Sequence, residues 1–239
     1  MKQRTFLVTG ASSGIGRAVC DRLNRDGHTV IGLARHKDPT FPGELVSVDL
    51  TNADVTASVL ADIACRHRLS GVVNNVGIVE TQPLEDVSLD KLRLVLDLNI
   101  RTAVQATQAA LPRMRKEQWG RIVNIASLVV LGGLERTSYA AAKAALIGMT
   151  RDWALELAAE GITANVVAPG STDTKMFRSF APPGSSEEAA YTNIIPVKRL
   201  GEPRELAAAI CFFMSEDAGF ITGQTLHVDG GESIGKASF

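Results

Sequence analysis

The chain of 239 residues has few cysteines and no long apolar run. Cys20, Cys65 and Cys211 lie far apart and form no Cys-x-x-Cys pair, so we expect no metal site and a reduced, cytoplasmic protein. No segment approaches the ~20 apolar residues that span a bilayer, and no apolar leader precedes the first predicted strand. The 25 basic and 26 acidic residues give a net charge of -1, which excludes the strongly basic surface typical of nucleic-acid-binding proteins.

A linker rich in proline, glycine and serine is also missing, and a chain of this length can bury one large core. We therefore expect a single domain over residues 1–239. Short apolar runs alternate with longer helical patterns, which indicates βαβ units and a parallel sheet covered on both faces. The predicted fold class is α/β, with a doubly wound, Rossmann-like sheet of seven parallel strands.

The predicted strands are residues 5–8, 29–33, 45–48, 71–74, 121–125, 163–168 and 225–228. Helical periodicity predicts helices over 15–25, 53–66, 138–159 and 204–214, and over 89–114 in two pieces. In the helix over 138–159, the residues that recur at helical spacing are Ala142, Leu146, Met149 and Trp153. They define the expected core face of that helix.

The segment 171–196 is rich in serine, threonine, proline and glycine, and a loop of this length in a compact domain is usually functional or mobile. We predict that it forms a mobile substrate loop. The apolar residues expected to line a substrate pocket are Met176, Phe177, Phe180, Val129, Leu131 and Leu134. The alternative is that the aromatic residues of this loop fold back on the core.

Three glycines, Gly10, Gly14 and Gly16, follow the first predicted strand and open the first predicted helix. Glycine permits a tight turn and a close approach of the backbone to a pyrophosphate, and the free N–H groups of a helix start attract negative charge. The pattern therefore predicts a phosphate-binding loop. The alternative, glycines that serve only a tight turn, is disfavoured by the strand before them and the helix after them.

The end of the second predicted strand indicates which dinucleotide is bound. An acidic residue at this position binds the ribose hydroxyl of NAD, whereas an arginine holds the 2′-phosphate of NADP. This chain has Arg35 and no carboxylate there, so Arg35 can pair with the phosphate. We predict NADP(H), with His36 and Lys37 as helpers, and NAD(H) as the alternative if Arg35 is an ordinary solvated charge.

Tyr139 and Lys143 are four residues apart, so a helix presents both side chains on one face. A free tyrosine has a pKa of about 10, and a nearby cation favours the phenolate. We therefore expect Lys143 to lower the pKa of Tyr139. This pair makes Tyr139 a candidate general acid or base.

Together these motifs resemble the short-chain dehydrogenase/reductase family, in its compact single-domain branch, along almost the whole chain. The glycine loop is similar to that family's cofactor loop, and Asn74-Asn-Val-Gly77 to its Asn-Asn-Ala-Gly segment. The catalytic tetrad that the resemblance implies is Asn99, Ser127, Tyr139 and Lys143. Ser127 and Tyr139 are one residue closer in sequence than is common in the family, and we expect the tetrad geometry to survive this shortening.

The resemblance also implies the cofactor-binding residues. Asp49 and Leu50 fall where relatives hold the adenine, and the turn at Pro169 and Gly170 is similar to the one that holds the nicotinamide. The full implied set is Gly10, Ser12, Ser13, Gly14, Ile15, Gly16, Arg35, Asp49, Leu50, Asn75, Gly77, Tyr139, Lys143, Pro169, Gly170, Thr172 and Thr174.

Within the family, the chain length and the segment 196–203 are most similar to the 3-oxoacyl-carrier-protein reductases. The predicted function is an NADP(H)-dependent oxidoreductase that transfers hydride between nicotinamide and a ketone or secondary alcohol, with Tyr139 as general acid or base. The resemblance implies that Ser127 binds the carbonyl oxygen, Lys143 the nicotinamide ribose and Asn99 a water. A small ketone, a 3-oxoacyl thioester and a sugar-like polyol all stay open as substrates.

The alternative functions are an NAD(H)-dependent polyol or secondary-alcohol dehydrogenase, a catalytically silent NADPH-binding regulator and a structural subunit of a mixed oligomer. We expect a small-molecule substrate and no nucleic-acid or membrane partner. The resemblance implies a homo-oligomer, a tetramer built through the helices over 99–114 and 138–159, with a dimer left open. The basic residues proposed to meet an acyl-carrier protein are Arg113, Lys116, Lys175 and Arg178.

Overall fold

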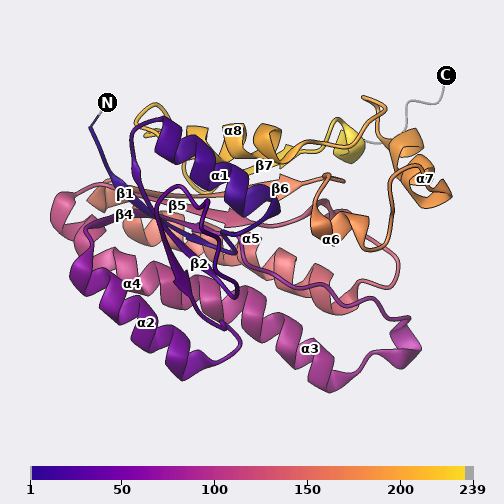
Figure 1. Cartoon of the computed structure of the whole chain (residues 1–239), viewed down its shortest axis with the longest axis horizontal. Coiled ribbons are helices and arrows are strands. Elements are labelled where there is room, and N and C mark those ends of the chain that lie inside the picture. The colour runs from indigo at the N-terminus through magenta and orange to yellow at the C-terminus, as the bar shows by residue number, and fades with distance from the viewer. Residues whose placement is uncertain (1, 235–239) are drawn as a thin grey trace.

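A computed structural model describes residues 2–234 of the chain (Figure 1). Seven parallel strands form one sheet in the order β3-β2-β1-β4-β5-β6-β7. The strands are β1 (Thr5–Thr9), β2 (Thr29–Ala34), β3 (Glu44–Ser47), β4 (Leu69–Asn74), β5 (Gly120–Ile125), β6 (Ile162–Pro169) and β7 (Thr225–Val228). The predicted Rossmann-like fold is confirmed, and each predicted strand lies within two residues of an observed one.

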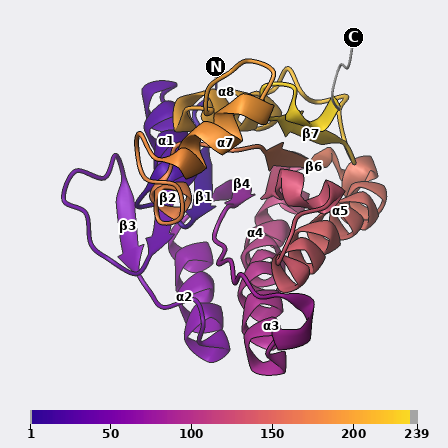
Figure 2. The ribbon, with the colours of Figure 1, turned by 90° about the vertical axis from the view of Figure 1, so that its right-hand side faces the viewer.

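Helices cover both faces of this sheet (Figure 2). On one face lie α1 (Gly14–Arg25) and α8 (Pro203–Phe213), which pack against each other. The other face carries α2 (Ala53–Arg66), α3 (Leu89–Leu96), α4 (Thr102–Glu117) and α5 (Thr137–Leu157). Short 3₁₀ turns occupy Leu84–Asp86, Leu128–Leu131, Ala158–Glu160 and Glu232–Ile234.

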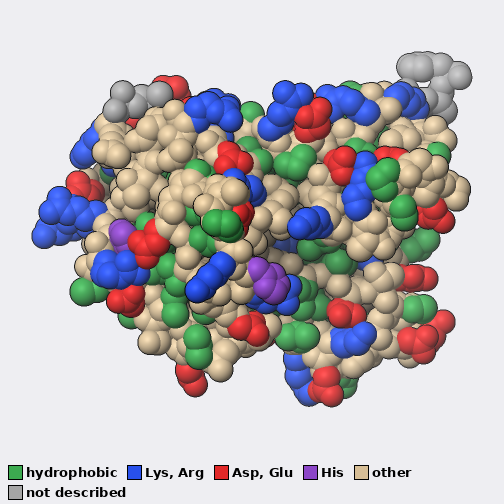
Figure 3. Space-filling view, viewed as in Figure 1, with side chains coloured by type: hydrophobic (Ala, Val, Ile, Leu, Met, Phe, Trp, Pro, Cys, Tyr) green, Lys and Arg blue, Asp and Glu red, His purple; other side chains and the backbone are tan. Residues whose placement is uncertain are grey.

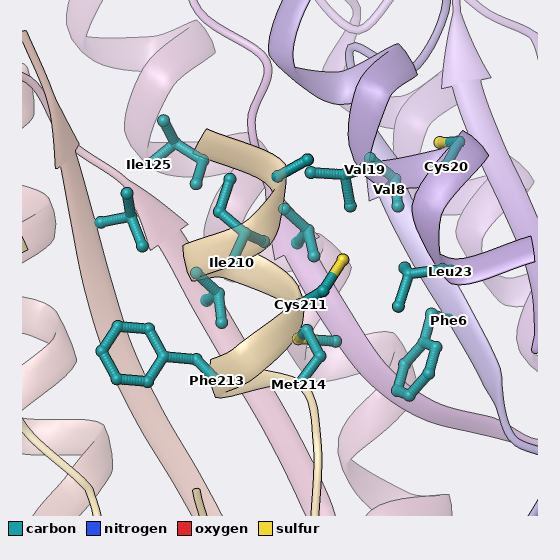
Figure 4. Packing of buried hydrophobic residues seen from close by; sticks show 14 of the residues in the cluster. Phe6, Val8, Val19, Cys20, Leu23, Ile125, Ile210, Cys211, Phe213 and Met214 are labelled. Atoms are coloured by element: carbon teal, nitrogen blue, oxygen red, sulfur yellow. The ribbon is translucent and has the colours of Figure 1, made fainter. Parts of the chain in front are cut away.

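The sheet is buried because apolar residues point to both of its sides. Phe6 and Val8 of β1 contact the α1 and α8 face, where Figure 4 shows Val8 near Val19 and Phe6 near Leu23. Leu7, between them in sequence, faces the second core, which lies between the sheet and the helices α2 and α4. Successive strand residues point to opposite faces, so one apolar run supplies two hydrophobic cores.

The segment 171–196 is not the structureless loop that the sequence suggested. It contains two helices, α6 (Lys175–Arg178) and α7 (Ser186–Ile194). Both begin with a side-chain cap, since Thr174 Oγ1 accepts from the Phe177 N–H at 3.2 Å and Ser185 Oγ accepts from the Glu188 N–H at 3.2 Å. The sequence did not predict these helices because they are short and largely polar, so they show no hydrophobic periodicity.

The two predicted pieces of the helix over 89–114 are joined by a widened π turn, Asp97–Arg101. The chain therefore continues without a break from α3 into α4. In α5 the expected core face is partly wrong: Met149 and Trp153 are only half-buried, whereas Thr150 and Ala154 are fully covered. The buried stripe is rotated slightly from the predicted one.

Charged side chains of both signs are interspersed on the face drawn in Figure 3. Many form local pairs, such as Arg22 Nε with Asp26 Oδ2 at 2.9 Å and Arg66 Nη1 with Glu44 Oε1 at 2.9 Å. Within residues 2–234, no helix has the length and hydropathy needed to cross a membrane. The cysteines are all free, with Cys20 and Cys211 buried and Cys65 exposed.

Candidate active site

A cavity of about 1250 Å³ opens where the central strands end. Its walls come from the segments that follow each of the strands β1 to β6, together with α6 and α7. The carboxyl ends of parallel strands meet at one edge of the sheet, and ligands of doubly wound folds bind at this edge, where the strand order reverses. Here the reversal lies between β1 and β4, which are neighbours in the sheet.

The glycine loop forms one end of the cavity, lined by Gly10, Ser12, Ser13, Gly14 and Ile15. Gly10 and Gly14 have positive φ angles of 66° and 54°, a conformation that favours glycine. A Cβ on Gly10 would also lie 2.9 Å from Asn75 Nδ2. The loop can therefore bring its backbone against a ligand only with glycine at these positions.

Gly16, which was predicted as a cofactor residue, does not line the cavity. It lies in the first turn of α1, where a Cβ would clash with Gly10 O and come 2.6 Å from Asn75 Nδ2. Gly16 thus permits close packing of the helix on the strand end. The other predicted cofactor residues all line the cavity wall.

Arg35, His36 and Lys37 line the cavity beyond the glycine loop and are exposed. The carboxylate that follows them, Asp38, is held by the Arg17 guanidinium and accepts from Thr40 N at 2.9 Å and Thr40 Oγ1 at 2.7 Å. Hydrogen bonds from Thr40, with Arg17 nearby, lower the pKa of Asp38. Asp38 is thus engaged by Arg17 and Thr40, and within residues 2–234 it forms no ion pair with Arg35 or Lys37, which both line the cavity.

The segment after β4 connects the two ends of the cavity. Asn75 Nδ2 donates to Thr9 O at 3.0 Å and to Gly10 O at 3.1 Å, which fixes the glycine loop. Two residues on, a Cβ on Gly77 would lie 2.5 Å from Asn99 Oδ1 and 3.1 Å from Lys143 Nζ. A side chain at position 77 would therefore collide with the side chains of Asn99 and Lys143, so only glycine fits there.

Lys143 and Asn99 are both almost fully buried. Lys143 Nζ donates to Ile125 O at 2.8 Å, and burial lowers the pKa of Lys143 to about 8. Asn99 Nδ2 donates to Val95 O at 2.8 Å and Ile78 O at 3.2 Å. Its Oδ1 is buried with no partner among residues 2–234. The π turn carries Asn99, and such turns often occur at functional sites.

Tyr139 and Ser127 both lie on the cavity wall, with the Ser127 hydroxyl near enough to favour the charged form of Tyr139. The expectation that Lys143 lowers the pKa of Tyr139 is wrong for this structure. Burial of the phenol raises the pKa of Tyr139, and the Ser127 hydrogen bond and the Arg136 charge offset this only in part. Lys143 Nζ lies 5.5 Å from the Tyr139 ring centroid, and its charge is not among the causes of this shift.

The shortened connection between Ser127 and Tyr139 is a compact turn. Ser127 Oγ accepts from the Val129 N–H at 3.3 Å and starts the 3₁₀ turn. Positive φ angles at Gly132 (119°) and Glu135 (59°) then bring the chain to the start of α5. The two catalytic candidates stay within hydrogen-bonding reach despite the missing residue.

The other end of the cavity is apolar, and its walls include Val129, Leu134, Met176, Phe177, Phe180, Tyr191 and Ile194. Leu131 is 60% exposed and does not line the cavity, which corrects the predicted pocket wall at this residue. The sequence left open whether the aromatic residues of this segment line the pocket or fold back on the core. Phe177 does both, because it lines the cavity and packs with Ile195 and Leu200. Sequence reasoning missed Tyr191 and Ile194, since α7 itself was not predicted.

Comparisons with known proteins place this geometry in a family. Residues 10–233 match a family model described as "Enoyl-(Acyl carrier protein) reductase". The chain is 37% identical to the 3-oxoacyl-acyl-carrier-protein reductase FabG of Vibrio harveyi, over 97% of this chain and 98% of the relative. The chain belongs to the short-chain dehydrogenase/reductase family. It is an oxidoreductase of that family, as the sequence predicted.

Two further relatives extend this similarity. FabG of Escherichia coli K12 is 36% identical, over 94% of this chain and 95% of that protein. The solved structure of the aldohexose dehydrogenase of Thermoplasma acidophilum superposes with a TM-score of 0.93 at 31% identity, covering 100% of this chain and 97% of that one. The family's relatives thus act on substrates of different chemistry, so the family alone does not define the substrate.

Proposed function

We propose that the protein reduces a ketone to a secondary alcohol with NADPH, in a reversible reaction. The observation that carries this proposal is the meeting of Ser127, Tyr139 and Lys143 between a glycine loop and an apolar recess in one cavity. A proton donor and a hydrogen-bond donor then flank the place where a substrate oxygen can bind.

NADP(H) is the cofactor. The residues present fit it: the loop around Gly10 and Gly14 leaves backbone N–H groups free for a diphosphate, and Arg35 with Lys37 suits the additional 2′-phosphate. A solved structure of ElxO, with a TM-score of 0.90 and 28% identity, contains NADP. When bound, NADPH supplies the hydride.

The protein's own groups handle the proton. The Tyr139 hydroxyl donates its proton to the carbonyl oxygen, and a raised pKa keeps this hydroxyl protonated at neutral pH. The Ser127 hydroxyl donates a hydrogen bond to the same oxygen as negative charge develops there. Lys143 and the unpartnered Oδ1 of Asn99 lie behind this pair, and they support a water that returns a proton to Tyr139.

A small ketone or a 3-oxoacyl thioester suits the apolar recess between Val129 and Phe180. The printed activity of the FabG relatives supports the thioester. Of the basic residues proposed to meet an acyl-carrier protein, Arg178 pairs with Asp173 and Glu188, and Arg113 pairs with Glu117. Lys175 lines the cavity mouth and is the best remaining contact.

We also propose a homotetramer in the cytoplasm. Leu155, on the outer face of α5, is 83% exposed, as expected for a helix that packs against another copy. Three free cysteines suit a reducing compartment.

The test is to follow NADPH and NADH absorbance over a panel of ketones, 3-oxoacyl thioesters and sugars, with the wild type and Tyr139→Phe. We expect NADPH consumption with at least one carbonyl, and loss of turnover by about 10³-fold or more in the variant. NADPH binding by the variant, measured by fluorescence, should stay near the wild-type value and shows that the variant is folded. Turnover retained in Tyr139→Phe, or a preference for NADH, contradicts the proposal. A wild type that binds NADPH but consumes none with any carbonyl would favour the silent regulator.

A further inference from the structure

A carboxylate, Glu232, lies in the cavity wall at a position that the sequence did not single out. It begins the 3₁₀ turn after β7, just beyond Gly230 and Gly231, whose φ angles are 65° and 91°. This turn packs on the end of the segment 171–196: Val197 N donates to Gly230 O at 3.3 Å, and a Cβ on Gly231 would lie 3.1 Å from Pro196. Glu232 is therefore fixed between the substrate segment and the end of β6.

The two oxygens of Glu232 have different surroundings. Ser171 lies close enough to Glu232 to favour its charged form and to offset part of the effect of burial. Oε2 is buried and has no hydrogen-bond partner among residues 2–234, whereas Oε1 is not buried in this way. Oε2 would lie 3.1 Å from a Cβ on Gly170, which leaves room for it only because that residue is glycine.

The neighbouring groups of the protein do not satisfy Oε2. Asp229 is the nearest charged group and repels it, and Asp229 itself accepts from Gly231 N at 2.9 Å and Ser233 N at 2.7 Å. Burial and Asp229 raise the pKa of Glu232. A buried acceptor left without a donor costs free energy, and a carboxylate oxygen is a strong acceptor. Glu232 lines the cavity, so a molecule bound there is a source of such a donor.

We propose that Glu232 is a ligand-binding residue whose Oε2 accepts a hydrogen bond from an N–H or O–H group of the molecule bound against the turn at Pro169 and Gly170. Two sources carry this chemistry: the primary amide of the nicotinamide and a hydroxyl of the carbonyl substrate. This inference rests on the proposed function, because it assumes that a nicotinamide and a carbonyl compound share the cavity.

Glu232→Gln tests the inference sharply. Glutamine keeps the size of the side chain, removes its charge and replaces one acceptor oxygen with an NH₂ donor, which opposes a donor of the ligand. Glu232→Met removes the acceptor without adding a donor. Glu85→Gln, an exposed residue outside the cavity, makes the same change of charge as a control.

Two measurements separate the sources. The first is the Kd of NADPH and of NADP⁺, from fluorescence titration without substrate. The second is kcat/KM for two ketones that differ only by a hydroxyl group next to the carbonyl. We expect Glu232→Gln to weaken either cofactor binding or kcat/KM for the hydroxylated ketone by about tenfold or more. The same quantity should fall less in Glu232→Met and should not change in Glu85→Gln. A loss of cofactor affinity identifies the nicotinamide amide, and a loss confined to the hydroxylated ketone identifies the substrate.

Values within twofold of wild type in both measurements, for a variant with wild-type circular dichroism, would overturn the inference and leave Glu232 a structural residue. If Glu232→Gln does not fold, Glu232→Met decides on the same criteria. If the wild type reduces no ketone, the proposed function has failed. The cofactor titration needs no turnover, and it then decides the role of Glu232 by itself.

Discussion

At the scale of single residues, Lys143 shows that a buried lysine needed in the active site lowers the stability of the fold. Its pKa falls from 10.5 to about 8 because burial disfavours the charged form. Between these values the unfolded chain binds more protons than the folded one, so stability rises as the pH goes from 8 to 10.5. Below pH 8 the full penalty applies, and the shift corresponds to about 3 kcal/mol.

We therefore expect Lys143→Met to raise the free energy of unfolding at pH 7 by about 1–3 kcal/mol, although it loses the hydrogen bond to Ile125 O. The rise in stability between pH 8 and 10.5 should disappear in this variant. Urea unfolding at several pH values measures both effects. Lys116→Met, at an exposed position, serves as the control and should change little. A Lys143→Met protein that is less stable than wild type at pH 7 contradicts the burial penalty.

A second residue, Glu135, adopts a positive φ of 59° in the shortened turn between Ser127 and Tyr139. Residues other than glycine are strained in this region. Glu135→Gly should relieve the strain and stabilise the protein by about 0.5 kcal/mol, since the greater freedom of glycine in the unfolded chain offsets part of the gain. Thermal unfolding compares it with Glu135→Ala, which keeps the strain. Equal melting temperatures for the two variants would show that this turn stores no strain.

At the scale of elements, one arginine ties together the segment that forms the apolar end of the cavity. Arg178 of α6 binds Asp173 with two hydrogen bonds, of 2.7 and 2.9 Å, and reaches Glu188 of α7 at 2.6 Å. Glu188 in turn accepts from the Gly184 N–H at 2.6 Å. The two short helices are thus held to each other mainly by charged contacts on the outside and by aromatic contacts between Phe177 and Tyr191 within.

We expect Arg178→Met to loosen this segment, so that limited proteolysis cuts within residues 179–195 several-fold faster than in the wild type. The KM for the carbonyl substrate should rise more than kcat falls, because the tetrad lies on other elements. Arg204→Met, which removes an exposed pair with Glu202, is the matched control. Unchanged cleavage rates in Arg178→Met would mean that the aromatic contacts alone hold the segment.

The elements also show what a sequence can predict. Strands such as β6 are buried along their whole length, so their apolar runs stand out, and the glycine spacing marked the end of β1. The helices α6 and α7 depend on caps and on Arg178, which leave no period in the sequence. At the site, residue types were predictable, but the pKa of Tyr139 and the place of Glu232 depend on contacts between distant segments.

At the scale of the whole molecule, the opposite end of the sheet is dedicated to structure. Trp119, just before β5, is covered by the guanidinium groups of Arg4 and Arg121, at 3.3 and 4.3 Å from its ring centroid. Its Nε1 donates to Glu216 Oε2 at 2.7 Å, and Glu216 also pairs with Arg4 at 2.6 Å. These contacts join the chain before β1, the start of β5 and the end of α8, far from the cavity.

Trp119→Leu should therefore lower the free energy of unfolding by about 2 kcal/mol, through lost ring contacts and lost cation–π interactions. The value of kcat/KM should stay within about twofold of wild type, because none of these four residues lines the cavity. Chemical denaturation and steady-state kinetics test the two parts separately. Phe220→Leu, at a fully exposed position, provides the control for stability. A large loss of activity in a Trp119→Leu protein that is fully folded would show that the two ends of the sheet are coupled.

The strand order has a consequence for how the molecule is made. β1 emerges first, β2 and β3 add successively to one of its edges, and β4 to β7 add successively to the other. No strand has to insert between two that are already paired. The nascent chain can therefore extend its sheet outwards in the order of synthesis, and the cavity closes late, when the segment after β6 and the turn after β7 arrive.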